Sequence, residues 1–170
     1  MRLTEQKKVY WDACIWIELI NEAGPDRLER CKNVLSLLER EEVEIWTSAF
    51  TLAEVYKRKC SGVSVSLVET QDRAFEDFIE REDIVKVSVD VDVGNLARRL
   101  LRQYPVIKKP QDAVHVATCL LNNIDELHTF DGNDLLKLDD ALSRLDKLKL
   151  KICLPPAPEQ REMFTDDHAE

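Results

Sequence analysis

The chain has 170 residues, of which 44% are hydrophobic, which is enough for one globular domain with a sizeable core. No apolar run approaches the roughly 18 residues that a membrane span needs, and the N-terminal segment lacks the apolar stretch of a signal peptide, so we expect no membrane association. The formal net charge of −9 argues against a protein that binds nucleic acid through overall basicity alone.

The distribution of cysteine and charge refines these bounds. The five cysteines are widely spaced, odd in number and without a C-x-x-C pair, which predicts reduced thiols in a cytoplasmic protein and neither a disulfide framework nor a zinc site. The segment Leu154–Glu170 carries five acidic residues and one arginine. Basic residues cluster elsewhere, at 57–59, 98–102 and 108–109, so an RNA partner stays open.

The first third of the chain alternates strand and helix signals. Residues 8–12 (KVYWD) predict a short buried strand, and 13–24 predict a helix that ends at Gly24. A second helix is expected from Asp26, because apolar residues recur at spacings of three and four. Residues 43–48 (VEIWTS) predict a second strand, and 50–59 (FTLAEVYKRK) a helix after it.

The alternation continues through the middle of the chain. Residues 61–66 (SGVSVS) are expected to form a loop and 67–83 a helix. A third strand is predicted at 84–89, followed by a helix at 94–104. The clearest helix is 110–123 (PQDAVHVATCLLNN), which has proline in its first turn and an apolar face.

The last part predicts a strand at 125–130, a partly helical segment at 133–145 and a fifth strand at 148–153. Alternating strands and helices imply a three-layer α/β/α fold with a mostly parallel four- or five-stranded sheet. We therefore expect one domain over residues 1–153 and a mobile acidic tail over 154–170.

Four acidic residues from separate segments are expected at one edge of this sheet. Asp12 ends the first strand, and Glu54 lies in the helix after the second. Asp112 lies in the first turn of the helix before the fourth strand, and Asp131 follows that strand. Because sites in open parallel sheets collect at the carboxyl ends of the strands, these four carboxylates should meet there.

Each of these residues also has a purely structural explanation. Asp12 could cap the next helix, and Glu54 could be a solvated surface residue. Asp112 could interact with a helix dipole, and Asp131 could belong to an Asp-Gly turn. As a set, however, four converging carboxylates would repel one another unless counter-charged. Mg²⁺ or Mn²⁺, which prefers oxygen ligands, would provide that charge and could promote phosphodiester hydrolysis.

The same four segments resemble the acidic motifs of the PIN-domain ribonucleases. The matching stretches are VYWDACIWIELI, TSAFTLAEVYKRK, KKPQDAVHVATCLLNN and LHTFDGNDL, in the family's order and spacing, over residues 8 to about 153. The resemblance implies a metal-dependent endoribonuclease with a three-layer fold. It also implies a toxin of the VapC type that an antitoxin protein inhibits, as is common among small members.

By motif match, the implied catalytic and metal-binding residues are Asp12, Glu54, Asp112 and Asp131. Thr129 matches a supporting hydroxyl position of the family, and Asp134 matches a further acidic position. The family often has Thr or Ser directly after the first aspartate and Asn next, but here Ala13 and Cys14 occupy these positions.

The sequence also supports one alternative to the ribonuclease and several additional expectations. Ala13 and Cys14 support the alternative of a PIN-like domain that binds RNA or a protein partner without cleaving it. The candidate RNA contacts are Lys57, Arg58, Lys108 and Lys109. His115 is interpreted as a hydrogen-bonded core residue rather than a metal ligand. Apolar positions in the helices at 66–80 and 95–104 predict a homodimer.

Overall fold

The computed structural model describes residues 6–22, 24–132 and 134–158. Its main sheet has five strands in the order β5-β2-β1-β6-β7, and every neighbouring pair is parallel. The strands are β1 (Lys7–Trp11), β2 (Val43–Ser48), β5 (Ile84–Val87), β6 (Glu126–His128) and β7 (Lys151–Cys153). The predicted three-layer α/β/α fold with a mostly parallel sheet is confirmed.

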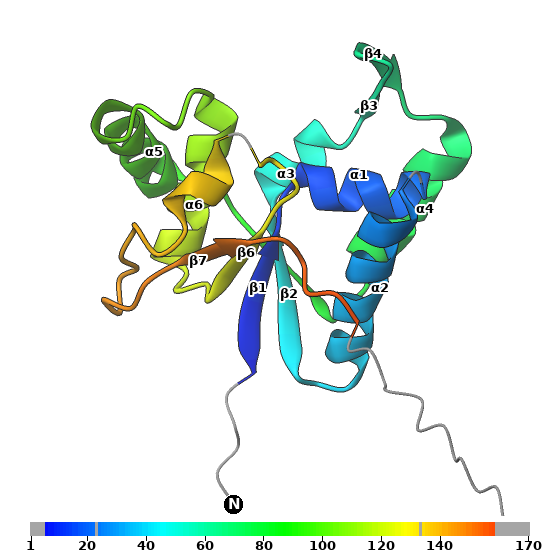
Figure 1. The fold of residues 1–170 in the computed structure, drawn as a ribbon, viewed down its shortest axis with the longest axis horizontal. Coiled ribbons are helices and arrows are strands. Elements are labelled where there is room, and N and C mark those ends of the chain that lie inside the picture. Colours follow the sequence, from blue (N-terminus) through cyan, green and yellow to red (C-terminus); the bar gives the residue numbers. More distant parts are fainter. Residues whose placement is uncertain (1–5, 23, 133, 159–170) are drawn as a thin grey trace, which may run out of the picture.

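Helices cover both faces of the sheet, as Figure 1 shows. One side carries α1 (Ala13–Asn21), α2 (Pro25–Glu39) and α4 (Glu69–Glu80), and the other carries α5 (Val91–Gln103) and α6 (Pro110–Leu121). The short α3 (Ala49–Glu54) follows β2 directly, and a 3-10 turn, η1 (Leu135–Leu138), follows β6. None of the helices that the structure describes is both long and apolar enough to cross a membrane.

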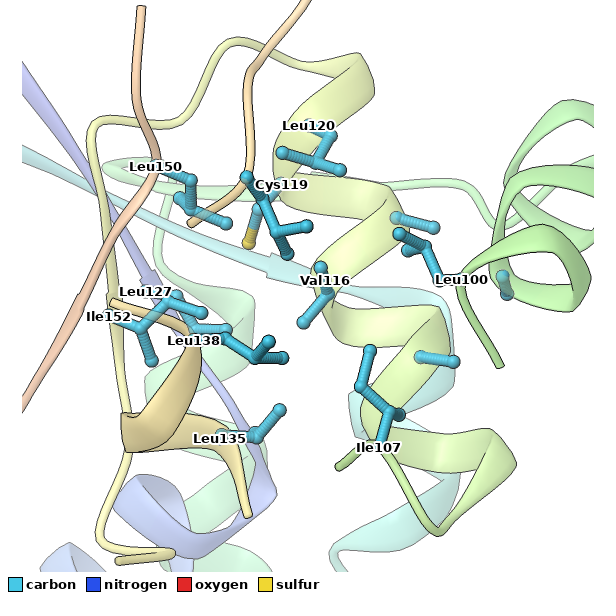
Figure 2. Close-up of a cluster of buried hydrophobic side chains, with 14 of the residues drawn as sticks. Leu100, Ile107, Val116, Cys119, Leu120, Leu127, Leu135, Leu138, Leu150 and Ile152 are labelled. Atoms are coloured by element: carbon cyan, nitrogen blue, oxygen red, sulfur yellow. The ribbon is translucent and has the colours of Figure 1, made fainter. Parts of the chain in front are cut away.

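The two faces of the sheet have separate hydrophobic cores, because successive side chains of a strand point to opposite sides. In β1, Val9 and Trp11 pack with α1, α2 and α4, whereas Tyr10 packs with α5 and α6. Figure 2 shows the second core, where Leu127 and Ile152 from the sheet meet Val116 and Leu120 of α6. The predicted alternation of strands and helices thus places β1 at the centre, with both faces buried.

One predicted segment is wrong. The helix expected over 50–59 ends at Glu54, and the following residues form an antiparallel hairpin of β3 (Lys57–Cys60) and β4 (Val63–Ser66). The loop expected over 61–66 is therefore the turn and second strand of this hairpin. The physical signal was Ser61-Gly62, whose backbone φ angles of 49° and 83° suit a two-residue hairpin turn.

The C-terminal boundary is partly described. Residues 154–158 run beside α2, where Arg30 donates to the carbonyl oxygen of Pro155 and Asn33 donates to that of Pro156. Residues 159–170 of the predicted tail lie outside the described residues, so the domain boundary stays a prediction. The homodimer also stays a prediction, although the buried apolar residues of α5 pack within the chain's own core.

We predict that Leu127→Ala lowers the free energy of unfolding by about 2 to 5 kcal/mol, because the leucine is fully buried and its loss leaves a cavity. Urea denaturation followed by circular dichroism measures the change. Leu148→Ala is the matched control, since this leucine is 62% exposed; we expect a change within about 0.5 kcal/mol there. Equal losses in both variants would contradict the described core.

Candidate active site

Asp12 stands at the carboxyl end of the central strand and begins α1. Its carboxylate accepts hydrogen bonds from the backbone N–H groups of Cys14, at 3.0 Å, and Ile15, at 3.2 Å. Asp12 is 5% exposed and still lines a cavity at this edge of the sheet. Asp12 therefore caps α1, and the cap is compatible with the predicted site role, because one oxygen of the carboxylate accepts both bonds.

Glu54, the last residue of α3, reaches the same cavity and is held by a buried histidine. Its Oε2 lies 2.7 Å from Nε2 of His115, whose Nδ1 lies 2.9 Å from the hydroxyl of Tyr10. The Tyr10 hydroxyl in turn donates to Ser48. His115 is 3% exposed. The interpretation of His115 as a hydrogen-bonded core residue agrees with this geometry, but its partner is one of the predicted site residues.

Asp112 lies in the first turn of α6, after Pro110, and is 8% exposed. Its Oδ2 is buried and has no hydrogen-bond partner among the described residues. Burial raises the pKa of Asp112 to about 6, and Asp131 adds to the rise while Lys109 opposes it. A buried oxygen without a donor is costly, so this atom is suited to a cationic ligand.

Asp131 and Asp134 complete the acidic side of the cavity. Carboxylate oxygens of Asp112, Asp131 and Asp134 lie within 4.8 Å of one another. Lys109 Nζ lies 3.4 Å from Asp131, and Lys108 Nζ lies 2.9 Å from Asp134 and lowers the pKa of that carboxyl. Asp134, expected only as a supporting residue, thus belongs to the tightest part of the cluster.

These five carboxylates, together with Glu18, line one cavity of about 630 Å³. The same lining includes Lys57, Arg58, Lys59 and Lys109, and it also includes Arg27, whose guanidinium lies 4.9 Å from the ring centre of Phe130. Sequence reasoning missed Arg27 and Phe130, because the start of α2 gives no sign that it faces the carboxyl end of β6. Lys108 lies at the margin, bound to Asp134.

Cys14 replaces the hydroxyl or amide that the family pattern would place near Asp12. Its thiol lies 2.7 Å from Asp12 Oδ1, donating to the carboxylate, and its sulfur accepts the N–H of Phe130 at 3.1 Å. Thr129 accepts the N–H of Asp131 at 2.9 Å, so it supports the turn that follows β6. The departure at Cys14 therefore leaves Asp12 with a side-chain donor.

The arrangement fits a hard divalent cation. The donor set is entirely carboxylate, and it includes the buried, unpartnered oxygen of Asp112. Oxygen ligands of this kind suit Mg²⁺ or Mn²⁺. The residues that could hold the ion are Asp112, Asp131 and Asp134, with Asp12 and Glu54 at the same cavity.

A second cluster, Glu126, His128 and Cys153, is less suited to a metal. Glu126 already pairs with Lys7 and Lys151, and His128 Nε2 lies 3.1 Å from its Oε2. The other ring nitrogen of His128 accepts the indole N–H of Trp11, so a metal at Nε2 would force a proton onto a nitrogen that already faces a donor.

Comparison with known proteins adds a family and a fold. The family model described as PIN domain matches residues 9–141. VapC20 from Mycobacterium tuberculosis, a Sarcin-Ricin loop cleaving toxin, is 19% identical with a TM-score of 0.57, over 74% of this chain and 91% of that one. Among curated proteins, none matches this chain.

Two further solved structures share the fold. VapBC2 from Rickettsia felis, bound to a DNA fragment from its promoter, is 19% identical with a TM-score of 0.56, over 85% of this chain and 98% of that one. A toxin–antitoxin complex from Klebsiella pneumoniae is 20% identical with a TM-score of 0.53, over 75% and 89%. At such identities the likeness concerns the fold alone.

We predict that Asp112→Asn stabilises the metal-free protein at neutral pH. Its folded pKa of about 6 exceeds the ordinary 3.8, so the folded state retains a proton that the unfolded state loses as pH rises between these values. Stability of the unaltered chain therefore falls across that window and stays low above it. Relative to it, Asp112→Asn should gain about 1 to 2 kcal/mol near pH 7.5 and little near pH 4.

Urea denaturation in EDTA at the two pH values measures this difference. Asp77→Asn, at an exposed position of α4, is the control for the amide substitution itself. If Asp112→Asn changed stability by the same amount at both pH values, burial would not be holding a proton on Asp112.

Proposed function

The chain belongs to the PIN domain family, and from this premise we propose that it is a Mg²⁺- or Mn²⁺-dependent endoribonuclease that hydrolyses RNA phosphodiester bonds. The catalytic residues of the proposal are Asp12, Glu54, Asp112 and Asp131. The proposal also includes Asp134, because its carboxylate lies beside those of Asp112 and Asp131. The observation that carries the proposal is the buried, unpartnered Oδ2 of Asp112 beside Asp131 and Asp134. A structural cluster would be expected to pair that oxygen with a donor.

A divalent ion supplies Lewis acidity toward a phosphodiester oxygen and counter-charge for the acids. The residues of this chain hold and orient that centre. Asp112, Asp131 and Asp134 offer oxygens for the ion, and the N-terminal amides of α1 fix the carboxylate of Asp12. His115 fixes Glu54 from behind, so that one carboxylate oxygen stays oriented. Lys109, beside Asp131, would supply a cationic group for a phosphate oxygen of the substrate.

The proposal includes a biological role as the toxin of a toxin–antitoxin pair in the cytoplasm. Its support is the shared fold with VapC20 and with two toxin–antitoxin complexes. The partners proposed are therefore RNA as substrate and an antitoxin protein as inhibitor. The alternative, a domain that binds RNA without cleaving it, loses part of its motive because Cys14 supplies a donor to Asp12.

We predict that Asp12→Asn lowers RNA cleavage at least 100-fold, because a neutral amide is a poor ligand for a hard dication. Asparagine caps a helix about as well as aspartate, so α1 should be kept. In the unaltered chain, Mn²⁺ at roughly 100 times its Kd should raise Tm by about 5 to 10 °C, since it binds only the folded state. The Asp12→Asn protein should show a smaller rise.

Cleavage of a labelled RNA in Mn²⁺ and in EDTA, with melting curves in both, measures these effects. Asp26→Asn on α2 is the matched control, because this side chain is 81% exposed and outside the cavity. Cleavage by Asp12→Asn at the rate of the unaltered chain would refute this carboxylate cluster as the site of cleavage. RNA binding without metal-dependent cleavage by the unaltered chain would favour the non-cleaving alternative.

A further inference from the structure

The β3–β4 hairpin stands out from the body of the domain above α1, as Figure 1 shows. Its four pairs run from Lys57↔Ser66 to Cys60↔Val63. The base is fixed, because Val55 is 3% exposed and the N–H of Leu67 donates to the carbonyl oxygen of Tyr56 at 3.0 Å. The tip is free of the core, with Val63 64% exposed. The hairpin is thus an arm anchored at its base, directly after Glu54.

The arm brings three cations to the cavity that holds the carboxylates. Lys57, Arg58 and Lys59 all line this cavity, and none of them forms an ion pair with another described residue. Three basic side chains that face acidic ones without pairing leave room for a ligand between them. Such a ligand must present negative charge to the basic side chains of the arm. It must also be able to bind a cation held by the carboxylates. A phosphodiester meets both requirements.

Arg58 carries the stronger signal. Its Nε is buried and has no hydrogen-bond partner, and the only other buried side-chain atom in this condition among the described residues is Asp112 Oδ2. Both residues line the same cavity. A phosphate oxygen would satisfy the arginine donor, and a cation that the phosphate also contacts would satisfy the aspartate acceptor. An ordinary solvated hairpin explains Lys57 and Lys59, which are exposed, but it does not explain a buried, unpartnered Nε.

Tyr56 extends this basic surface with an aromatic ring. It is 55% exposed at the base of the arm, and Lys57 Nζ lies 4.9 Å from its ring centre. An exposed ring beside a row of cations is a platform on which an unpaired base can stack, and stacking of this kind requires a single strand.

We propose that the β3–β4 hairpin is the substrate arm of this site and binds single-stranded RNA. Arg58 contacts the phosphate next to the carboxylates, Lys57 and Lys59 contact neighbouring phosphates, and Tyr56 stacks on a base. The inference rests on the proposed function for the identity of the ligand, and it adds the segment and the residues of this chain that contact the RNA.

Fluorescence anisotropy with a labelled single-stranded oligoribonucleotide in EDTA, over a series of salt concentrations, tests the arm without cleavage. Arg58→Gln should raise Kd about tenfold and reduce the slope of log K against log salt by about 0.7, the loss of one phosphate contact on a single strand. Arg58→Lys should keep the slope and raise Kd less, because it retains the charge and loses the planar fork. Tyr56→Ala should raise Kd about tenfold.

Arg98→Gln is the matched control, since Arg98 is an exposed arginine on α5, across the sheet from α1 and outside the cavity. It should leave both Kd and slope unchanged, and melting curves should show that each variant is folded. The same RNA annealed to its complement should bind several-fold more weakly than the single strand.

The proposal for the arm would be refuted if Arg58→Gln and Arg58→Lys both bound RNA as tightly as Arg98→Gln does. It would also be refuted if the unaltered chain did not bind RNA, or if the duplex bound as tightly as the single strand. These results differ from failure of the nuclease. If the unaltered chain does not cleave in Mn²⁺ or Mg²⁺ but Arg58→Gln weakens binding, the nuclease is refuted and the arm is supported.

Discussion

The mutual repulsion of carboxylates at one edge of the sheet is the main constraint on the arrangement of this cavity. Six acids line one cavity, and five of them have a donor or a cation at hand, including Glu18 beside Arg27. Asp12 has the amides of α1, Asp131 has Lys109, Asp134 has Lys108, and Glu54 has His115. Only Asp112 keeps a buried oxygen without a partner, and its pKa rises accordingly.

This uneven distribution of partners indicates where the proposed cation would bind. If every acid were compensated within the chain, an added ion would have to displace bonds and would gain little. If no acid were compensated, the repulsion would oppose folding, because like-charge repulsion in the folded state lowers the small free energy of unfolding of a domain. The observed arrangement leaves one deficit, at Asp112, and holds two more carboxylates within reach of it. The parallel sheet makes this possible because β1 and β6 are neighbours and end at the same edge.

The sequence predicted those features that depend on local patterns, and it missed those that depend on contacts between distant residues. The fold and the convergence of the four acids on one cavity could be predicted, because strand–helix alternation and the motif order are carried by local patterns. The hairpin could not, because Lys57, Arg58 and Lys59 continue a helix by propensity as easily as they form a strand. What decides is the Ser61-Gly62 turn and its pairing with Val63–Ser66. The sequence predicted only a supporting role for Asp134. Its closeness to Asp112 could not be predicted, because the two residues lie on different elements and are far apart in the sequence.

The hydrogen bonds around Glu54 indicate how the chain keeps this carboxylate in the cavity with little added repulsion. The Tyr10 hydroxyl has one proton and donates it to Ser48, so the ring of His115 must donate from Nδ1 to Tyr10. Burial raises the pKa of Tyr10, which keeps that proton in place. The contact between Nε2 and Glu54 then needs a further proton, held by either the imidazole or the carboxyl.

In both cases the Glu54–His115 pair has no net charge, since an imidazolium faces a carboxylate or a neutral ring faces a carboxylic acid. The pair therefore does not add to the repulsion among the other acids in the metal-free protein. When the proton resides on His115, Glu54 is a carboxylate whose other oxygen would be available to the proposed divalent ion. A histidine three residues after Asp112 on α6 thus links the two sides of the cavity. It lowers the repulsion in the metal-free protein, and it would leave a charged ligand available to the proposed ion.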